Sequence, residues 1–134
     1  MRFSYENRNE LNNIPLIDTA FKGFQYSYEK REVSFSCTDQ VLRIHHEFVF
    51  QNVVYFEMQS ASFWNGGYNI YYCGLIESPP QLEHLYSIQQ AHPNLYDHSA
   101  LAEGTSFVSM ELQLNSGDTM LIIFEAVEYK QKQF

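Results

Sequence analysis

Basic residues are scarce in this chain of 134 residues, which has 8 lysines and arginines against 16 aspartates and glutamates, for a formal net charge of −8. A protein that binds nucleic acid needs a basic face to neutralise phosphates, so this balance argues against that class. It argues equally against binding to an anionic membrane surface. The acidic excess suits a cationic partner, such as a more basic protein.

Long apolar runs and cysteines are also few. No stretch approaches the roughly 18 apolar residues of a membrane span, and the N-terminus has no apolar segment of the kind that a signal peptide needs. We therefore expect the chain to stay in the cytoplasm with Cys37 and Cys73 reduced, since two cysteines make no disulfide framework. Both fall on apolar strand faces, and we interpret them as small buried hydrophobic residues.

Aromatic residues are abundant, with 11 Phe and 10 Tyr beside a single Trp. A chain of this length and composition can bury a core of its own without disulfides or metal. We predict one domain over residues 1–134, with a loosely held lead-in over residues 1–15 and a frayed tail over residues 130–134.

Apolar and polar residues alternate along most of the chain, which predicts strands. The segments with this pattern are 21–28, 32–38, 42–51, 53–60, 69–77 and 108–114, and residues 120–124 are apolar on both faces, as in a central strand. A proline pair opens a helical stripe over residues 80–91. The fold predicted is mainly β (α+β), an antiparallel β-sandwich or half-barrel of about six to eight strands with that one helix.

Two groups of histidines are candidate sites. His45 and Glu47 share one strand face and could form an acid–base couple, while His46 faces the other side, so the pair has no third group. His84, His92 and His98 are separated by eight and six residues, which does not match the spacing of zinc hydrolases. We interpret both groups as structural or solvated.

Motifs for nucleotide binding or nucleophilic catalysis are missing. The chain has no P-loop, no G-x-G-x-x-G and no G-x-S-x-G. We therefore predict a protein that is not an enzyme and that uses no metal or cofactor.

A loop around Gly66–Gly67 carries the most conspicuous aromatic residues. Trp64 and Tyr68 lie on it, and Tyr71 and Tyr72 follow in the next strand. Such residues could stack on a sugar or another flat group, which would make this a ligand-binding β domain. The alternative is that they fold onto the end of the sheet and help to fill the core.

One stretch resembles a known group of proteins. Residues 16–21 read Leu-Ile-Asp-Thr-Ala-Phe and precede two strands, and the run at 48–56 is rich in Phe and Val. This resembles the opening of small bacterial β-rich domains that begin with a Leu-His-Asp-Ser motif, among them uncharacterised proteins and immunity proteins of polymorphic toxin systems. Ile17 stands where His is usual, and Thr19 where Ser is. The resemblance covers the first half of the chain and implies a compact β fold without catalysis.

These observations favour a non-enzymatic module that binds a more basic protein through an acidic face. Opposite charge would speed the association and favour that partner. The residues expected to carry it are the acidic strand positions Glu47, Glu57 and Glu111 and the loop aromatics Trp64 and Tyr68. The small-ligand function is the alternative, and an uncovered edge strand could also pair two copies as a homodimer.

Overall fold

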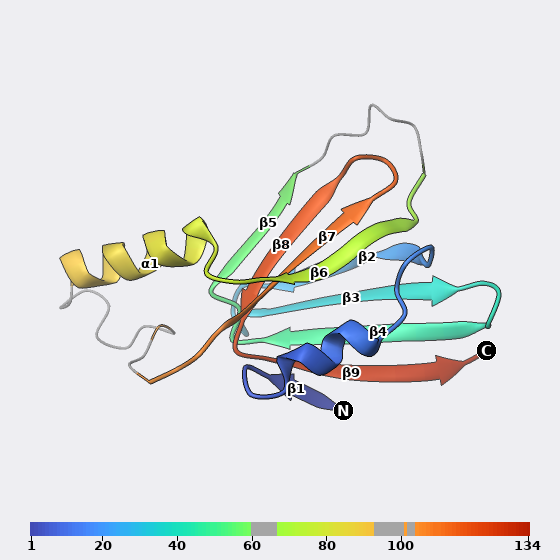
Figure 1. Ribbon diagram of the computed structural model, residues 1–134, viewed down its shortest axis with the longest axis horizontal. Coiled ribbons are helices and arrows are strands. Elements are labelled where there is room, and N and C mark those ends of the chain that lie inside the picture. Colours follow the sequence, from blue (N-terminus) through green and yellow to red (C-terminus); the bar gives the residue numbers. More distant parts are fainter. Residues whose placement is uncertain (60–66, 93–100, 102–103) are drawn as a thin grey trace.

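A computed structural model describes residues 1–59, 67–92, 101 and 104–134. These residues form nine strands in two antiparallel sheets and one α-helix, which confirms the predicted sandwich-like β fold and exceeds the predicted strand count. Figure 1 shows the strands of one sheet running obliquely across those of the other. None of the described helices is long and apolar enough to cross a membrane.

The first sheet has five strands in the spatial order β1-β9-β4-β3-β2. Alternate residues of its central strands are buried, because one face packs on the second sheet and the other faces outward. Its strands are β1 (Arg2–Ser4), β2 (Ala20–Ser27), β3 (Glu32–Asp39), β4 (Ile44–Gln51) and β9 (Ala126–Gln133).

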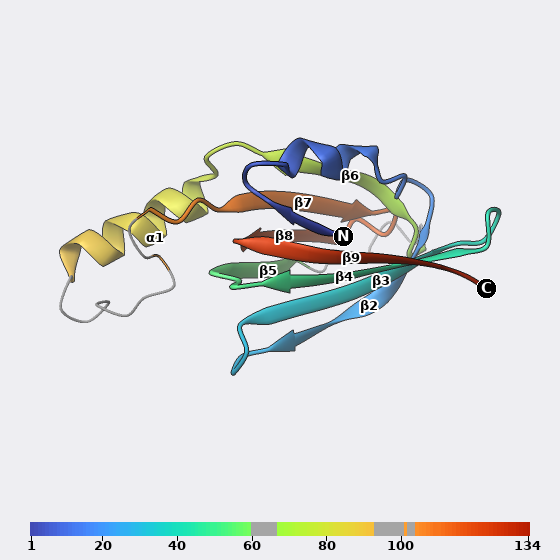
Figure 2. The same cartoon turned by 90° about the horizontal axis from the view of Figure 1, so that it is seen from below.

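The second sheet has four strands in the order β5-β8-β7-β6. Its strands are β5 (Tyr55–Gln59), β6 (Ile70–Ile76), β7 (Val108–Leu114) and β8 (Thr119–Phe124). Strand β8 pairs on both sides and is buried on both faces, as its doubly apolar sequence predicts. Figure 2 shows the helical turn of residues 8–13 lying beside β6.

The core lies between the two sheets and is rich in aromatic rings. Phe35 stacks on Phe48 and Phe50, with ring centroids 4.7 Å and 5.4 Å apart. The edge of the Phe124 ring, from the opposite sheet, meets Phe50 at 4.7 Å. Burial of several large rings is the main favourable term for this fold. Among the described residues, eight of the chain's 22 aromatic residues are buried and eight are exposed.

The α-helix α1 (Pro80–Ala91) has the bounds predicted from the sequence. It projects away from the sheets in Figure 1 and has no fully buried residue. Its half-buried side chains Leu82, Leu85 and Tyr86 pack on a small second cluster that includes Phe107 and Ile123, on the outer side of β8.

The two termini are more ordered than predicted. Residues 130–133 are not a frayed tail, because they complete β9 and pair with β4. The lead-in is held as well, since β1 pairs with β9 and the short 3-10 helix η1 (Arg8–Asn13) buries Leu11. Residues 130–133 are exposed on both faces. These residues are ordered by backbone pairing, which requires no apolar side chains. The sequence therefore shows no alternation of apolar and polar residues here.

Candidate functional site

The outer face of the four-stranded sheet brings acidic residues from different strands into one row. The strand register places Gly74 of β6 beside Glu111 of β7, Glu111 beside Leu121 of β8, and Leu121 beside Glu57 of β5. Paired residues in antiparallel strands point to the same side of a sheet. We call this surface the acidic face; its outward-facing residues are Tyr55, Glu57, Gln59, Tyr72, Glu111, Gln113, Thr119 and Leu121.

Glu57 and Glu111 line the same shallow pocket of about 210 Å³. They are separated by two strand spacings, which puts their Cα atoms about 10 Å apart. Pro79 and Pro80, where α1 begins, form another part of the pocket wall. The space between the two carboxylates is therefore open to an incoming group.

The hydrogen bonds to these carboxylates come from neutral side chains. The Tyr55 hydroxyl and Gln59 Nε2 donate to Glu57, the second at 2.9 Å, and Gln113 Nε2 donates to Glu111 at 3.3 Å. The bond to Glu57 and burial both raise the pKa of Tyr55. Among the described residues, no lysine or arginine forms an ion pair with either carboxylate. The two negative charges are oriented but not neutralised.

Tyr72 adds an aromatic ring to the acidic face. A β-carbon added at Gly74 would lie 2.9 Å from Cζ of the Tyr72 ring, so this ring lies directly over the glycine. Gly74 is the cross-strand partner of Glu111, which puts the ring beside that carboxylate. Tyr55, two residues before Glu57 on β5, donates its hydroxyl to that carboxylate, and its ring packs on the cluster around Ile123. A carboxylate next to an aromatic ring is a favourable arrangement for a cationic side chain.

The distribution of basic residues along the sequence is a second signal for this face, independent of the strand pattern. Residues 44–129 contain 10 of the 16 acidic residues and none of the 8 lysines and arginines. All four strands of the second sheet lie in that range. Acidic residues are no denser here than elsewhere, but the lysines and arginines all lie outside this range, so the excess of negative charge falls within it.

The structure separates the other predicted binding residues from this face. Glu47 lies on the outer side of the five-stranded sheet, 3.6 Å from Lys132 in an exposed ion pair. Tyr68 is exposed near Lys22, whose Nζ lies 5.8 Å from the ring centroid. Tyr71 falls at a bulge in β6 and is 66% exposed. Trp64 lies outside the described residues. Of the binding residues predicted from the sequence, Tyr72, Glu57 and Glu111 therefore lie together on the acidic face.

The histidines of β4 point to opposite sides of the sheet, as predicted. His46 is buried, with Nδ1 2.7 Å from the Tyr129 hydroxyl, whereas His45 Nδ1 lies 2.9 Å from Thr38 Oγ1 on the outer side. His84 and His92 lie on and just after α1, and His98 is outside the described residues. Within the described part of the chain, no three histidine, cysteine or acidic side chains gather as a metal site would require.

Both cysteines are embedded in apolar surroundings. Cys37 is buried in the main core and Cys73 is half-buried against it. Burial raises the pKa of the Cys37 thiol to about 11 and that of Cys73 to about 12. Thiols of this kind are poor nucleophiles at neutral pH.

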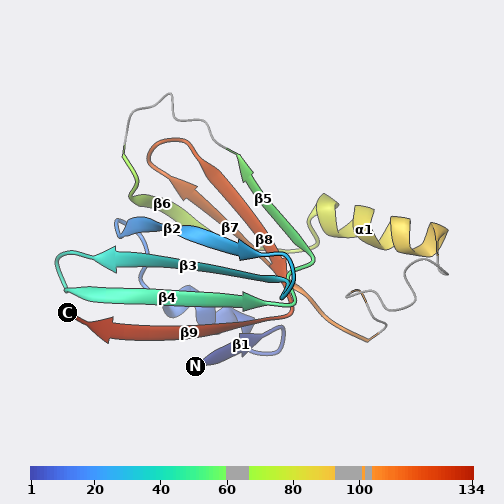
Figure 3. The ribbon, with the colours of Figure 1, turned by 180° about the vertical axis from the view of Figure 1, so that it is seen from behind.

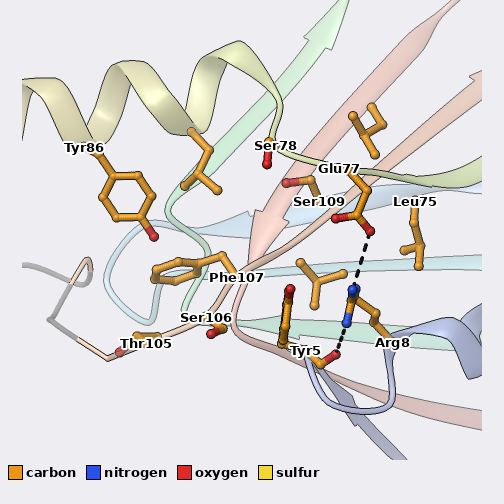
Figure 4. Close-up of a pocket in the computed structure, with 13 residues that line it drawn as sticks. Tyr5, Arg8, Leu75, Glu77, Ser78, Tyr86, Thr105, Ser106, Phe107 and Ser109 are labelled. Atoms are coloured by element: carbon orange, nitrogen blue, oxygen red, sulfur yellow. Dashed lines mark hydrogen bonds and ion pairs between the residues drawn. The ribbon is translucent and has the colours of Figure 1, made fainter.

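A second pocket, of about 220 Å³, lies where the lead-in meets β6 and α1 (Figure 4). Arg8 dominates one wall: its guanidinium is 3.6 Å from Glu77, donates to the Tyr5 carbonyl at 2.7 Å, and sits 3.9 Å from the Tyr5 ring centroid. Tyr86 and Phe107 line the other wall. The charged side chains that line this pocket, Arg8 and Glu77, pair with each other, although the buried Nε of Arg8 has no hydrogen-bond partner among the described residues. We interpret the contacts around this pocket as structural, because they hold the lead-in against the second sheet.

Neither a protein-family model nor a curated protein matches this chain.

Proposed function

We propose that this protein is a non-enzymatic interaction module that binds a more basic protein through the acidic face. The observation that supports it best is the pair of carboxylates, Glu57 and Glu111, which line one pocket without a cationic partner from the described residues. An incoming lysine or arginine would meet a carboxylate on either side. It would also meet the ring of Tyr72, which lies over Gly74 beside Glu111.

The charge distribution supports the same partner class. A surface of one sign steers a partner of opposite sign and raises its rate of association. The resemblance of the first half of the chain to immunity-type proteins agrees with a protein partner of this kind. The alternative, a site for small flat ligands, has less support. Tyr68 lies just before β6 with its ring near Lys22, whereas the ring of Tyr72 lies over Gly74 on the acidic face, and a shared stacking site would need both.

The test is a pull-down from the native lysate with the tagged protein, in low salt and in about 1 M salt, where the screening length falls to about 3 Å. We expect a basic protein to be captured in low salt and lost in high salt. The double variant Glu57→Gln, Glu111→Gln should capture less of it, with each carboxylate contributing about 0.2–1 kcal/mol.

Glu47→Gln is the matched control. It removes the same charge from the other sheet, where Glu47 already pairs with Lys132. Its capture should equal that of the wild type. A role for the acidic face would be contradicted if the amount of captured protein did not change with salt. It would also be contradicted if Glu47→Gln reduced capture as much as the double variant does.

A further inference from the structure

The four edge strands of the two sheets differ in how they are protected. Unpaired edges invite strand addition, and proteins normally shorten them, bulge them or cover them. Strand β1 has only three residues, and β2 carries a bulge where Gly23 has a φ of +113°. Strand β6 has a bulge too, and the lead-in covers its start, since the Asp18 amide donates to the Ile70 carbonyl at 2.8 Å.

Strand β5 has none of these protections among the described residues. It pairs with β8 over five residues in unbroken register and with no other described strand. It contains no proline, glycine or lysine. Figure 3 shows it at the outer limit of its sheet. The amides and carbonyls of every second residue along β5 therefore point away from the sheet.

The two sides of this edge have different chemistry. Phe56 points inward and meets two rings of β2 across the gap between the sheets, Phe24 at 5.1 Å and Tyr26 at 5.7 Å between centroids. Phe24 and Tyr26 are 39% and 44% exposed, so apolar surface remains open there. Glu57 points to the opposite side, onto the acidic face. A strand added to β5 would thus meet apolar surface with one set of side chains and a carboxylate with the alternate set.

This asymmetry argues against a second copy of the chain as the occupant. A symmetric antiparallel pairing of β5 with itself, centred on the middle of the strand, places Glu57 opposite its own copy. Like charges directly opposite each other destabilise a strand pair. A segment with cations at those positions has the complementary charge.

We propose that β5 accepts an extended segment of the basic partner as an added strand, in which lysine or arginine alternates with apolar residues. The basic residues lie beside Glu57 on the acidic face, and the apolar residues cover Phe56, Phe24 and Tyr26. Main-chain hydrogen bonds to the β5 edge hold the segment in register, as in other cases of β-strand addition. This inference rests on the proposed function, whose partner class it specifies.

The test uses a capped heptapeptide of alternating lysine and valine as a probe, titrated to millimolar concentration into the isotope-labelled full chain and followed by amide NMR. Two control peptides separate the contributions. In the first control, a block isomer of the same composition, all lysines precede all valines, so the charge is kept and the alternation is lost. In the second, the backbone nitrogens are methylated, so the side chains are kept and the backbone N–H donors are lost. We expect shifts centred on β5 and on Phe24–Tyr26 with the alternating peptide. Both controls should bind at least about tenfold more weakly, a loss of about 1.4 kcal/mol.

The variants Glu57→Gln and Glu47→Gln complete the test. The first should weaken the alternating peptide by about two- to fivefold, and the second should leave it unchanged. The absence of shifts in β5, or equal binding of the block isomer, overturns the strand-addition proposal. Charge-dependent capture in the pull-down would then still support the proposed function. Shifts in β5 without charge-dependent capture would overturn the proposed function instead.

Discussion

His46 Nδ1 lies 2.7 Å from the hydroxyl oxygen of Tyr129, and both side chains are buried between the sheets. The Tyr129 hydroxyl oxygen also lies 3.1 Å from Gln131 Oε1. His46 Nε2 has no hydrogen-bond partner among the described residues. The imidazolium carries a proton on both ring nitrogens, so a second proton on the ring would bring a charge with an unpaired N–H into the core.

This arrangement makes stability depend on pH. Burial lowers the pKa of His46, with the charge of Asp39 opposing and His45 reinforcing the shift. Below the ordinary histidine pKa of about 6.5, the unfolded chain takes up a proton that the folded protein does not. The free energy of unfolding should therefore fall as the pH drops from about 7 towards the lowered pKa. Urea unfolding followed by circular dichroism at several pH values measures this slope.

Two histidine variants isolate the effect. His46→Gln should reduce the loss of stability on acidification, because the titrating group is gone. His84→Gln, on the exposed side of α1, should retain the wild-type slope. An unchanged slope in His46→Gln would show that His46 is not the group responsible.

The cysteines should resist modification in the folded protein. With a thiol pKa of about 11, roughly one Cys37 in ten thousand is a thiolate at pH 7, and Cys73 is still less ionised. We expect Ellman's reagent to react slowly with the native protein and with both thiols at once in denaturant. The variant Cys73→Ser, measured alongside, reports Cys37 alone. Rapid reaction of either thiol at pH 7 in native conditions would contradict the assigned burial.

The C-terminal end of β9 should contribute to stability although it is exposed. Residues 130–133 pair with Ile44 to Glu47 of β4, and the Phe134 amide donates to the Arg43 carbonyl at 3.1 Å. Ending the chain after Tyr129 removes these bonds, each worth about 0.5–1.5 kcal/mol net. We expect a loss of about 2 kcal/mol or more in chemical unfolding, with faster amide exchange in the first half of β4. A truncated chain as stable as the wild type would restore the interpretation of a frayed tail.

The helix at 80–91 and the strand at 108–114 were predictable because their signals are local. A proline pair marks the helix start, and strict alternation marks the strand. The order of residues 130–133 was not predictable, since polar residues on both faces of a strand give no periodicity. Its stabilising contacts are backbone pairs with β4, more than 80 residues away in the chain.

The acidic face was predictable only in part. Alternation predicts that Glu57 and Glu111 point outward from their strands. It does not predict that both strands pair with β8, which places the two residues on either side of Leu121. For the same reason, the sequence does not show that Glu47 lies on a different sheet from Glu57 and Glu111. Sheet membership depends on long-range pairing, whereas the pattern within a strand is local.

The position of the Tyr72 ring can be tested without disturbing the fold. In Gly74→Ala, the new methyl group would meet the ring of Tyr72 at its hydroxyl end, which is the movable end of that side chain. The ring must swing away, while the backbone of β6 has no positive φ at Gly74 that alanine would strain.

Capture of the basic partner by Gly74→Ala should therefore weaken by about 0.5–1 kcal/mol, the value of an exposed cation–π contact, with little change in unfolding free energy. Tyr72→Leu should weaken capture by a similar amount, and combining the two substitutions should add almost nothing, because both remove the same contact. Full capture by Gly74→Ala, or additive losses in the double variant, would show that the ring over Gly74 does not take part in binding.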